Sequence, residues 1–255
     1  MSRFGNLELG GEFEDRSQPA LVKDEAYYFS EGNSAFGFGN FEQALRFYSK
    51  VLEFNPQNAA AWAGQVRMLI ELGEFREAKL WADKALERFP QFAELLAAKA
   101  VALARMGDLQ AALAFSDAAI EERGDTPYIW LARGDVLLAR KEQRANYCFE
   151  KAMMMAPKDW LIAWLAARVR YYYRQFVLAM KLLQQAVEWN PGHCWLWFEL
   201  GRCQQAVHLF GPAENSFRQA LELNPRCIEI ENALAELGRK GILARFASWI
   251  RGRFA

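Results

Sequence analysis

Prolines recur at a fixed interval in this chain, and the interval constrains the fold more than any other feature. Five of the eight prolines stand 34, 67, 34 and 34 residues apart. They are Pro56, Pro90, Pro157, Pro191 and Pro225, and Gly124 stands where a sixth would divide the long gap. Because a proline cannot continue a helix, each one is expected to mark the end of a helical unit. A period of this length is typical of stacked repeats.

The proline interval divides the chain into six windows in which small residues recur at the same places. The windows are 25–58, 59–92, 93–126, 127–159, 160–193 and 194–227. The twentieth position is alanine in five of them, and Ala145 comes one place early in the shortened fourth window. Turns such as Phe38-Gly39-Asn40-Phe41 separate segments whose apolar residues have helical spacing. Each window therefore predicts a helix, a short turn, a second helix and another turn.

This pattern resembles the tetratricopeptide repeat family over residues 25–227. The last window gives the clearest match, with Trp197, Gly201, Ala213, Phe217, Ala220 and Pro225. The resemblance implies an all-α fold, a right-handed superhelical solenoid of antiparallel helix pairs. We expect this solenoid to span residues 21–237, with a cap helix at 228–237. Residues 1–20 are polar and acidic, which predicts a flexible N-terminal tail.

Composition and motifs argue against several classes of function. The formal net charge is zero, with 31 basic and 31 acidic residues, which argues against general nucleic-acid binding. There is no phosphate-binding glycine loop, GxSxG elbow or HExxH motif, so we expect no enzyme and no small-molecule substrate. The four cysteines lack metal-site spacing, and we expect neither metal nor cofactor. Without a secretory signal or a long apolar stretch, the expected location is cytoplasmic.

The resemblance also implies where a ligand would bind, because the first helices of such repeats line a concave groove. Carried onto this chain, the groove positions of the last three windows are rich in aromatic residues and arginine, which binding hot spots favour. This predicted peptide-binding set is Tyr128, Leu131, Asp135, Trp164, Arg168, Tyr171, Tyr172, Trp195, Phe198 and Arg202. The first two windows add a secondary groove with Asn33 and Arg67.

The same residues have an alternative interpretation as internal packing. Trp164 and Tyr172 would then pack between neighbouring windows, and the arginines would pair with Asp135 or Glu199. The local pattern is compatible with either arrangement.

The C-terminal segment, residues 238–255, has a different character. From residue 237 onward the chain contains five basic residues and no acidic one. Apolar residues at 242, 243, 246, 249 and 250 form one helical stripe. The segment is therefore expected to be a basic amphipathic helix, which either completes the cap or contacts a membrane or a partner. In the second case the contact residues would be Arg245, Phe246, Trp249 and Arg251.

Together these features predict a non-catalytic scaffold or adaptor that binds a peptide or protein segment in its concave groove. Two alternatives stay open. One is an RNA-binding helical-repeat protein, in which bases would stack on the aromatic side chains. The other is a membrane-associated assembly factor that docks through its basic C-terminal helix, with peripheral contact at the membrane.

Overall fold

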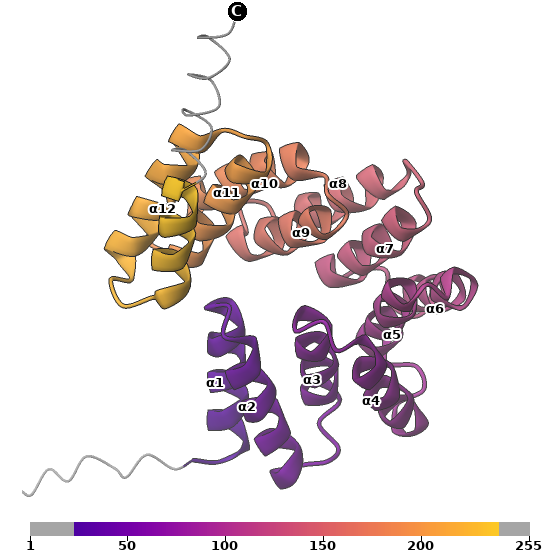
Figure 1. Ribbon diagram of the computed structural model, residues 1–255. Coiled ribbons are helices and arrows are strands. Elements are labelled where there is room, and N and C mark those ends of the chain that lie inside the picture. Colours follow the sequence, from indigo (N-terminus) through magenta and orange to yellow (C-terminus); the bar gives the residue numbers. More distant parts are fainter. Residues whose placement is uncertain (1–22, 240–255) are drawn as a thin grey trace, which may run out of the picture.

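The computed structural model describes residues 23–239, and within this range it contains helices and no strand. Twelve helices form six antiparallel pairs (Figure 1). The pairs are α1 (Glu25–Gly37) with α2 (Phe41–Phe54), α3 (Ala59–Glu71) with α4 (Phe75–Arg88), α5 (Ala93–Met106) with α6 (Leu109–Arg123), α7 (Pro127–Ala139) with α8 (Ala145–Met155), α9 (Trp160–Tyr172) with α10 (Phe176–Trp189), and α11 (Cys194–Ala206) with α12 (Phe210–Leu223). The predicted all-α helical-repeat solenoid is confirmed.

A further helix begins at residue 228 and runs to the end of the described range. It buries Ile230 and Leu237 against the last pair. The predicted tail over residues 1–20 lies outside the described residues. So do Arg245, Phe246 and Trp249 of the predicted C-terminal helix, together with its Arg251.

The recurring prolines stand just beyond the second helix of every pair except the third. Pro191, for example, lies two residues after the end of α10, and its carbonyl accepts a hydrogen bond from Trp197 Nε1 at 2.8 Å. Gly124 directly follows α6, and its carbonyl accepts the equivalent bond from Trp130 Nε1 at 2.8 Å. Gly124 therefore occupies the proline's place in the turn, which explains the gap in the proline series.

The small residues at repeated positions lie where the two helices of a pair approach most closely. The alanines at the twentieth position and Ala145 are fully buried. A Cβ atom built on Gly134 would lie 2.8 Å from Phe149 Cζ, and one on Gly201 would lie 2.6 Å from Phe217 Cδ1. An aromatic ring of the second helix thus packs directly on the backbone of the first. Only glycine leaves room for the ring at these two positions.

The turn inside each pair has a residue in the left-handed backbone conformation at the same position. In the first three pairs this residue is glycine, with φ of 75°, 85° and 92° at Gly39, Gly73 and Gly107. In the last three pairs it is a side-chain-bearing residue, namely Lys141, Arg174 and His208, with φ of 60°, 58° and 64°. This conformation costs a residue other than glycine about 1–2 kcal/mol. All six pairs therefore share the same turn geometry, although glycine marks the turn only in the first three.

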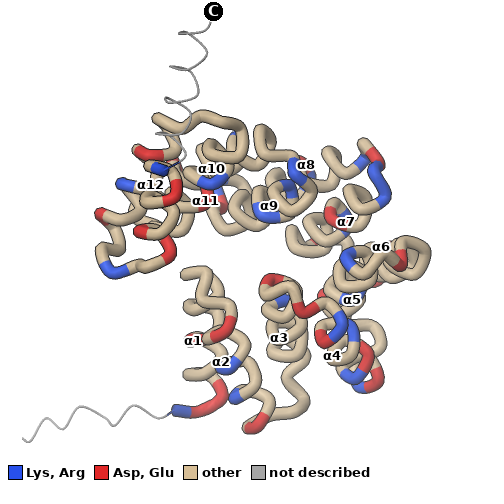
Figure 2. The backbone as a smooth tube through the Cα atoms, viewed as in Figure 1, with Lys and Arg blue, Asp and Glu red and all other residues tan. Residues whose placement is uncertain are grey.

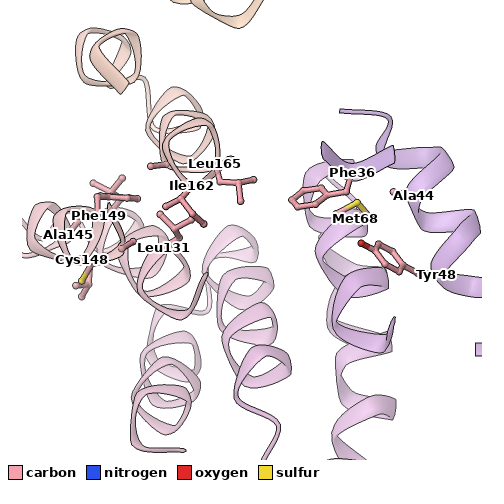
Figure 3. Close-up of a cluster of buried hydrophobic side chains, with 14 of the residues drawn as sticks. Phe36, Ala44, Tyr48, Met68, Leu131, Ala145, Cys148, Phe149, Ile162 and Leu165 are labelled. Atoms are coloured by element: carbon pink, nitrogen blue, oxygen red, sulfur yellow. The ribbon is translucent and has the colours of Figure 1, made fainter. Parts of the chain in front are cut away.

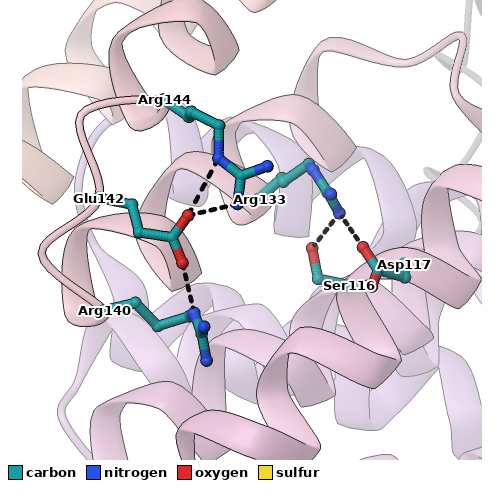
Figure 4. Close-up of polar contacts among 6 residues, drawn as sticks. All are labelled: Ser116, Asp117, Arg133, Arg140, Glu142 and Arg144. Carbon is teal, nitrogen blue, oxygen red and sulfur yellow. Dashed lines mark hydrogen bonds and ion pairs between the residues drawn. The ribbon is translucent and has the colours of Figure 1, made fainter.

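The fourth window is one residue shorter between Lys141 and Ala145, yet its turn between α7 and α8 spans residues 140–144, compared with 38–40 between α1 and α2, because α8 begins late. Helix α8 has 11 residues, whereas α2 and α10 have 14. The turn is held by Glu142, which accepts hydrogen bonds from Arg140 Nε at 2.6 Å and Arg144 Nε at 3.0 Å (Figure 4). Arg133 of α7 donates to Asp117 of α6 at 2.6 Å, so the pair stays attached to the one before it (Figure 4).

The pairs follow an arc that brings the first pair opposite the last two (Figure 1). Acidic and basic residues both occur along this arc (Figure 2). A cluster of buried apolar residues includes Phe36 and Met68 from the first half and Leu131 and Leu165 from the second. Leu165 of α9 points toward Phe36 of α1 across the inside of the arc (Figure 3). Among residues 23–239, no helix has the length and apolar character needed to cross a bilayer.

We predict that Gly201→Ala lowers the free energy of unfolding by about 1–3 kcal/mol, because the added methyl group overlaps the Phe217 ring. Gly192→Ala is the matched control, since no atom lies within 4 Å of a Cβ built there. Urea unfolding followed by circular dichroism measures both variants. Equal stability of the two would contradict the close packing at Gly201.

Candidate functional site

Contacts between the first pair and the last two pairs close the inner face of the arc. His193, which precedes α11, donates a hydrogen bond from Nε2 to the carbonyl of Gly37 at 2.8 Å. The Phe38 ring stacks on the imidazole, with 5.7 Å between ring centroids and 12° between ring planes. Phe41 at the start of α2 stacks on Trp164 of α9 at 6.1 Å. Trp164 is left only 1% exposed.

An ion-pair network reinforces this closure. Arg168 Nη2 of α9 lies 2.7 Å from Glu71 Oε2 at the end of α3, and its Nη1 pairs with Glu199 of α11. Glu199 also accepts a hydrogen bond from Trp164 Nε1 at 2.7 Å. Burial alone would lower the pKa of Arg168, but Glu199 and Glu71 outweigh it and raise the pKa above its ordinary value. The guanidinium therefore stays charged. It joins α9 to α3 through Glu71, which lies 97 residues earlier in the sequence.

A second buried network lies on the same face. Asp135 of α7 receives two hydrogen bonds from Arg105 of α5, from Nε at 2.9 Å and from Nη2 at 2.6 Å. The Tyr173 hydroxyl donates a third, at 2.7 Å. Burial opposes the charge of Arg105, yet the Asp135 carboxylate raises the pKa of the guanidinium above its ordinary value. This bidentate pair ties α5 to α7 and to the end of α9.

The Arg168 and Arg105 ion pairs border a cavity of about 540 Å³ on the inner face of the arc. Its size falls within the range of protein sites that bind small molecules, about 300–1,000 Å³. Its charged lining residues are Arg67, Glu71, Arg105, Asp135, Arg168, Arg174, Glu199 and Arg202. Its aromatic lining residues are Phe75, Tyr128, Tyr171, Tyr172 and Phe176. The cavity thus combines apolar rings with charge, which suits a ligand that has both kinds of surface.

The structure divides the predicted peptide-binding residues into two groups. Seven of them line the cavity: Tyr128, Leu131, Asp135, Arg168, Tyr171, Tyr172 and Arg202. The other three lie in packing contacts away from it. Trp164 is buried in the closure, Trp195 packs edge-on against Phe198 at 5.2 Å, and Phe198 packs on Phe217 at 5.7 Å.

The two secondary-groove residues are also separated. Arg67 lines the cavity, and its guanidinium lies 4.0 Å from the centroid of the Tyr128 ring. Asn33 lies elsewhere, on an exposed part of α1, and accepts a hydrogen bond from the Tyr48 hydroxyl at 2.8 Å.

Sequence reasoning missed the residues of the first two pairs that close the arc. Phe36, Phe38 and Phe41 form a dense aromatic group around a turn, and this density was the only local signal. Glu71 and His193 carried no signal, because their partners lie far away along the chain. Arg168 does pair with Glu199, as the packing alternative envisaged, but it also pairs with Glu71 across the arc.

Comparison with known proteins concerns the repeats and the fold. Residues 35–100 match the family model described as tetratricopeptide repeat. A tetratricopeptide repeat protein from Parabacteroides merdae has 18% identity and a TM-score of 0.54 over 87% of each chain. The thermophilic protein TTC0263 from Thermus thermophilus has 16% identity and a TM-score of 0.51 over 84% of this chain and 98% of that one.

A chain of the APC/C hetero-tetramer Cut9-Hcn1 has 16% identity and a TM-score of 0.52 over 84% of this chain. The match spans only 43% of that chain, so the present chain corresponds to less than half of its length. At these identities the likeness extends to the fold alone. No curated protein matches the sequence.

The closure generates a prediction about pH. Burial lowers the pKa of His193 below its ordinary value, although the Gly37 carbonyl and the Glu199 carboxylate oppose the shift. The unfolded chain therefore takes up a proton below about pH 6.5 that the folded chain does not. We predict that this contribution to stability is complete above about pH 6.5 and is lost as the pH falls toward the folded-state pKa.

Unfolding free energies in urea between about pH 7 and pH 5 test this prediction. His193→Gln should show a smaller decline than wild type, because the buried titrating group is gone. His208→Gln is the matched control, since His208 is exposed and the chain has only two histidines. A decline in His193→Gln as steep as that of the control would show that His193 does not cause it.

Proposed function

Since the chain is a tetratricopeptide repeat protein, we propose that it is a non-catalytic scaffold whose inner cavity binds a segment of a partner protein. Tetratricopeptide repeats generally act as protein–protein interaction scaffolds. The observation that most supports this proposal is an aromatic side chain left open at the cavity. The Tyr172 ring lines the cavity and is 47% exposed, so its apolar surface is available to a ligand that enters there.

The surroundings of Tyr172 support a role in binding. The Arg105 guanidinium lies 3.4 Å from the centroid of its ring, and Phe75 packs edge-on against it at 6.2 Å. Arg105 is itself fixed by its bidentate pair with Asp135. The exposed ring is therefore held in place before a ligand arrives, which reduces the entropy lost on binding. A ring presented in this way buries a large apolar area on contact.

The closure limits the length of the segment that this site can accept. Phe36, Phe41 and Trp164 fill the inner face between α1 and α9. A long helix cannot lie along the inner face while these rings are in contact. We therefore propose a short extended segment that inserts one or two side chains into the cavity and contacts Tyr172 at its edge.

Selection of binders from a library of random peptides, displayed on phage and panned against the full chain, tests the proposal. We expect the selected peptides to bind Tyr172→Ala at least roughly thirtyfold more weakly than wild type, as a hot-spot aromatic residue requires. Tyr147→Ala is the matched control, because Tyr147 on α8 is 58% exposed and does not line the cavity. Peptides that bind the Tyr172 variant as tightly as wild type would overturn the assignment.

A further inference from the structure

We infer that the inner cavity also binds a small organic anion, in which an oxyanion group is joined to a flat apolar body. The inference goes beyond partner binding and does not rest on it. It concerns a ligand rather than a substrate. Three observations on the cavity support it: an excess of positive charge, arginines without a carboxylate partner, and a lining of aromatic rings.

The cavity has more cations than anions. Five arginines line it, against the three carboxylates of Glu71, Asp135 and Glu199. Each of these carboxylates is already engaged by Arg168 or Arg105. The chain as a whole carries no formal net charge. The positive excess is thus a local property of the cavity, where a ligand of opposite charge would be attracted.

Arg67 is the first arginine without a carboxylate partner. Its guanidinium lies over two rings, 4.9 Å from the centroid of Phe36 and 4.0 Å from that of Tyr128. Within the described residues it forms no ion pair. Ring faces stabilise a guanidinium through cation–π attraction, but they accept none of the hydrogen bonds that its five N–H groups can donate in the guanidinium plane. Arg67 is half-buried. The hydrogen bonds that its N–H groups can still donate are therefore directed into a partly enclosed space.

Arg202 and Arg174 are two further cations of this kind. Arg202 on α11 lies over the Tyr171 ring at 4.8 Å, and it donates a hydrogen bond to the Tyr171 hydroxyl at 3.3 Å. Arg174 occupies the turn after α9. In the part of the chain that the structure describes, neither one pairs with a carboxylate. A guanidinium can hold a carboxylate, sulfonate or phosphate through two parallel hydrogen bonds, which these side chains have free.

The remaining lining suits a flat apolar body. Tyr171 packs edge-on against Phe176 at 5.2 Å, and Tyr172 packs edge-on against Phe75. These rings line the same cavity as the three arginines. The cavity has a volume of about 540 Å³, which is typical of small-molecule sites. A small organic anion therefore fits without displacing the rings that close the arc. Charge and apolar surface therefore meet within one site.

Two fluorescent probes with the same ring system separate charge from apolar contact. The anionic probe is 8-anilinonaphthalene-1-sulfonate, and the neutral probe is N-phenyl-1-naphthylamine, which lacks the sulfonate. We expect wild type to bind the anionic probe saturably at one site. Arg202→Met and Arg67→Met should each weaken binding of the anionic probe about tenfold or more, as expected when a charged hydrogen-bond donor is removed. Both variants should leave binding of the neutral probe unchanged.

Arg46→Met is the matched control, because Arg46 is exposed on α2 and does not line the cavity. It removes the same charge from the chain and should not change either affinity. Arg202 is also exposed, so its variant should fold, and an unchanged cooperative melting curve checks this. Arg67→Lys keeps the charge and should keep part of the preference for the anionic probe. Equal weakening in Arg46→Met and the two cavity variants would overturn the inference.

Competition identifies the kind of oxyanion. Benzoate and phenyl phosphate present the same ring with a carboxylate or a phosphate, and displacement of the anionic probe by either one supports the site. If neither compound displaces the anionic probe, even at a concentration high enough to occupy an arginine site, the inference is overturned. The partner-segment proposal has its own measurement in Tyr172→Ala, so a failure of the anion site and a failure of that proposal are distinguishable.

Discussion

The close contact of two helices at a small residue is the interaction on which the rest of this structure depends. In each pair an alanine or glycine lets the second helix approach the first, and at Gly134 and Gly201 an aromatic ring lies directly on the backbone. Each pair in turn stacks on the one before it, and in such repeats a small rotation is added at every step. The arc in Figure 1 is the sum of these rotations. Its closure, and the cavity inside it, follow from their accumulation.

Closure changes what the aromatic residues of the inner face can do. Trp164 has the residue type and repeat position of a binding hot spot, yet its ring packs against Phe36 and Phe41 of the first pair. The proposed site is therefore smaller than an open groove and lies near Tyr172 and Arg202. A residue cannot both hold the arc closed and bind a ligand in the same conformation, so internal contacts decide which rings are available.

Charge on the inner face has two distinct states. Arg105 and Arg168 are compensated by carboxylates, and removing one partner of the buried Arg105–Asp135 pair costs about 3–5 kcal/mol because the other charge is left alone. These two arginines therefore serve the structure. Arg67 and Arg202 contact only rings and a hydroxyl within the described residues. The division between paired and unpaired cations separates the framework of the cavity from the groups that are free to meet a ligand.

The sequence by itself determined the helices, their pairing and the repeat, because these depend on residues close together in the chain. The proline interval, the alanine positions and the helical spacing were enough for that. Only the tertiary structure decided that Arg168 meets Glu71, that His193 bonds to Gly37, and that seven of the ten expected groove residues border one cavity. Such contacts depend on the rotation added by each pair, and a small change in that rotation moves the ends of the arc by a large distance. No local sequence pattern indicates this accumulated rotation.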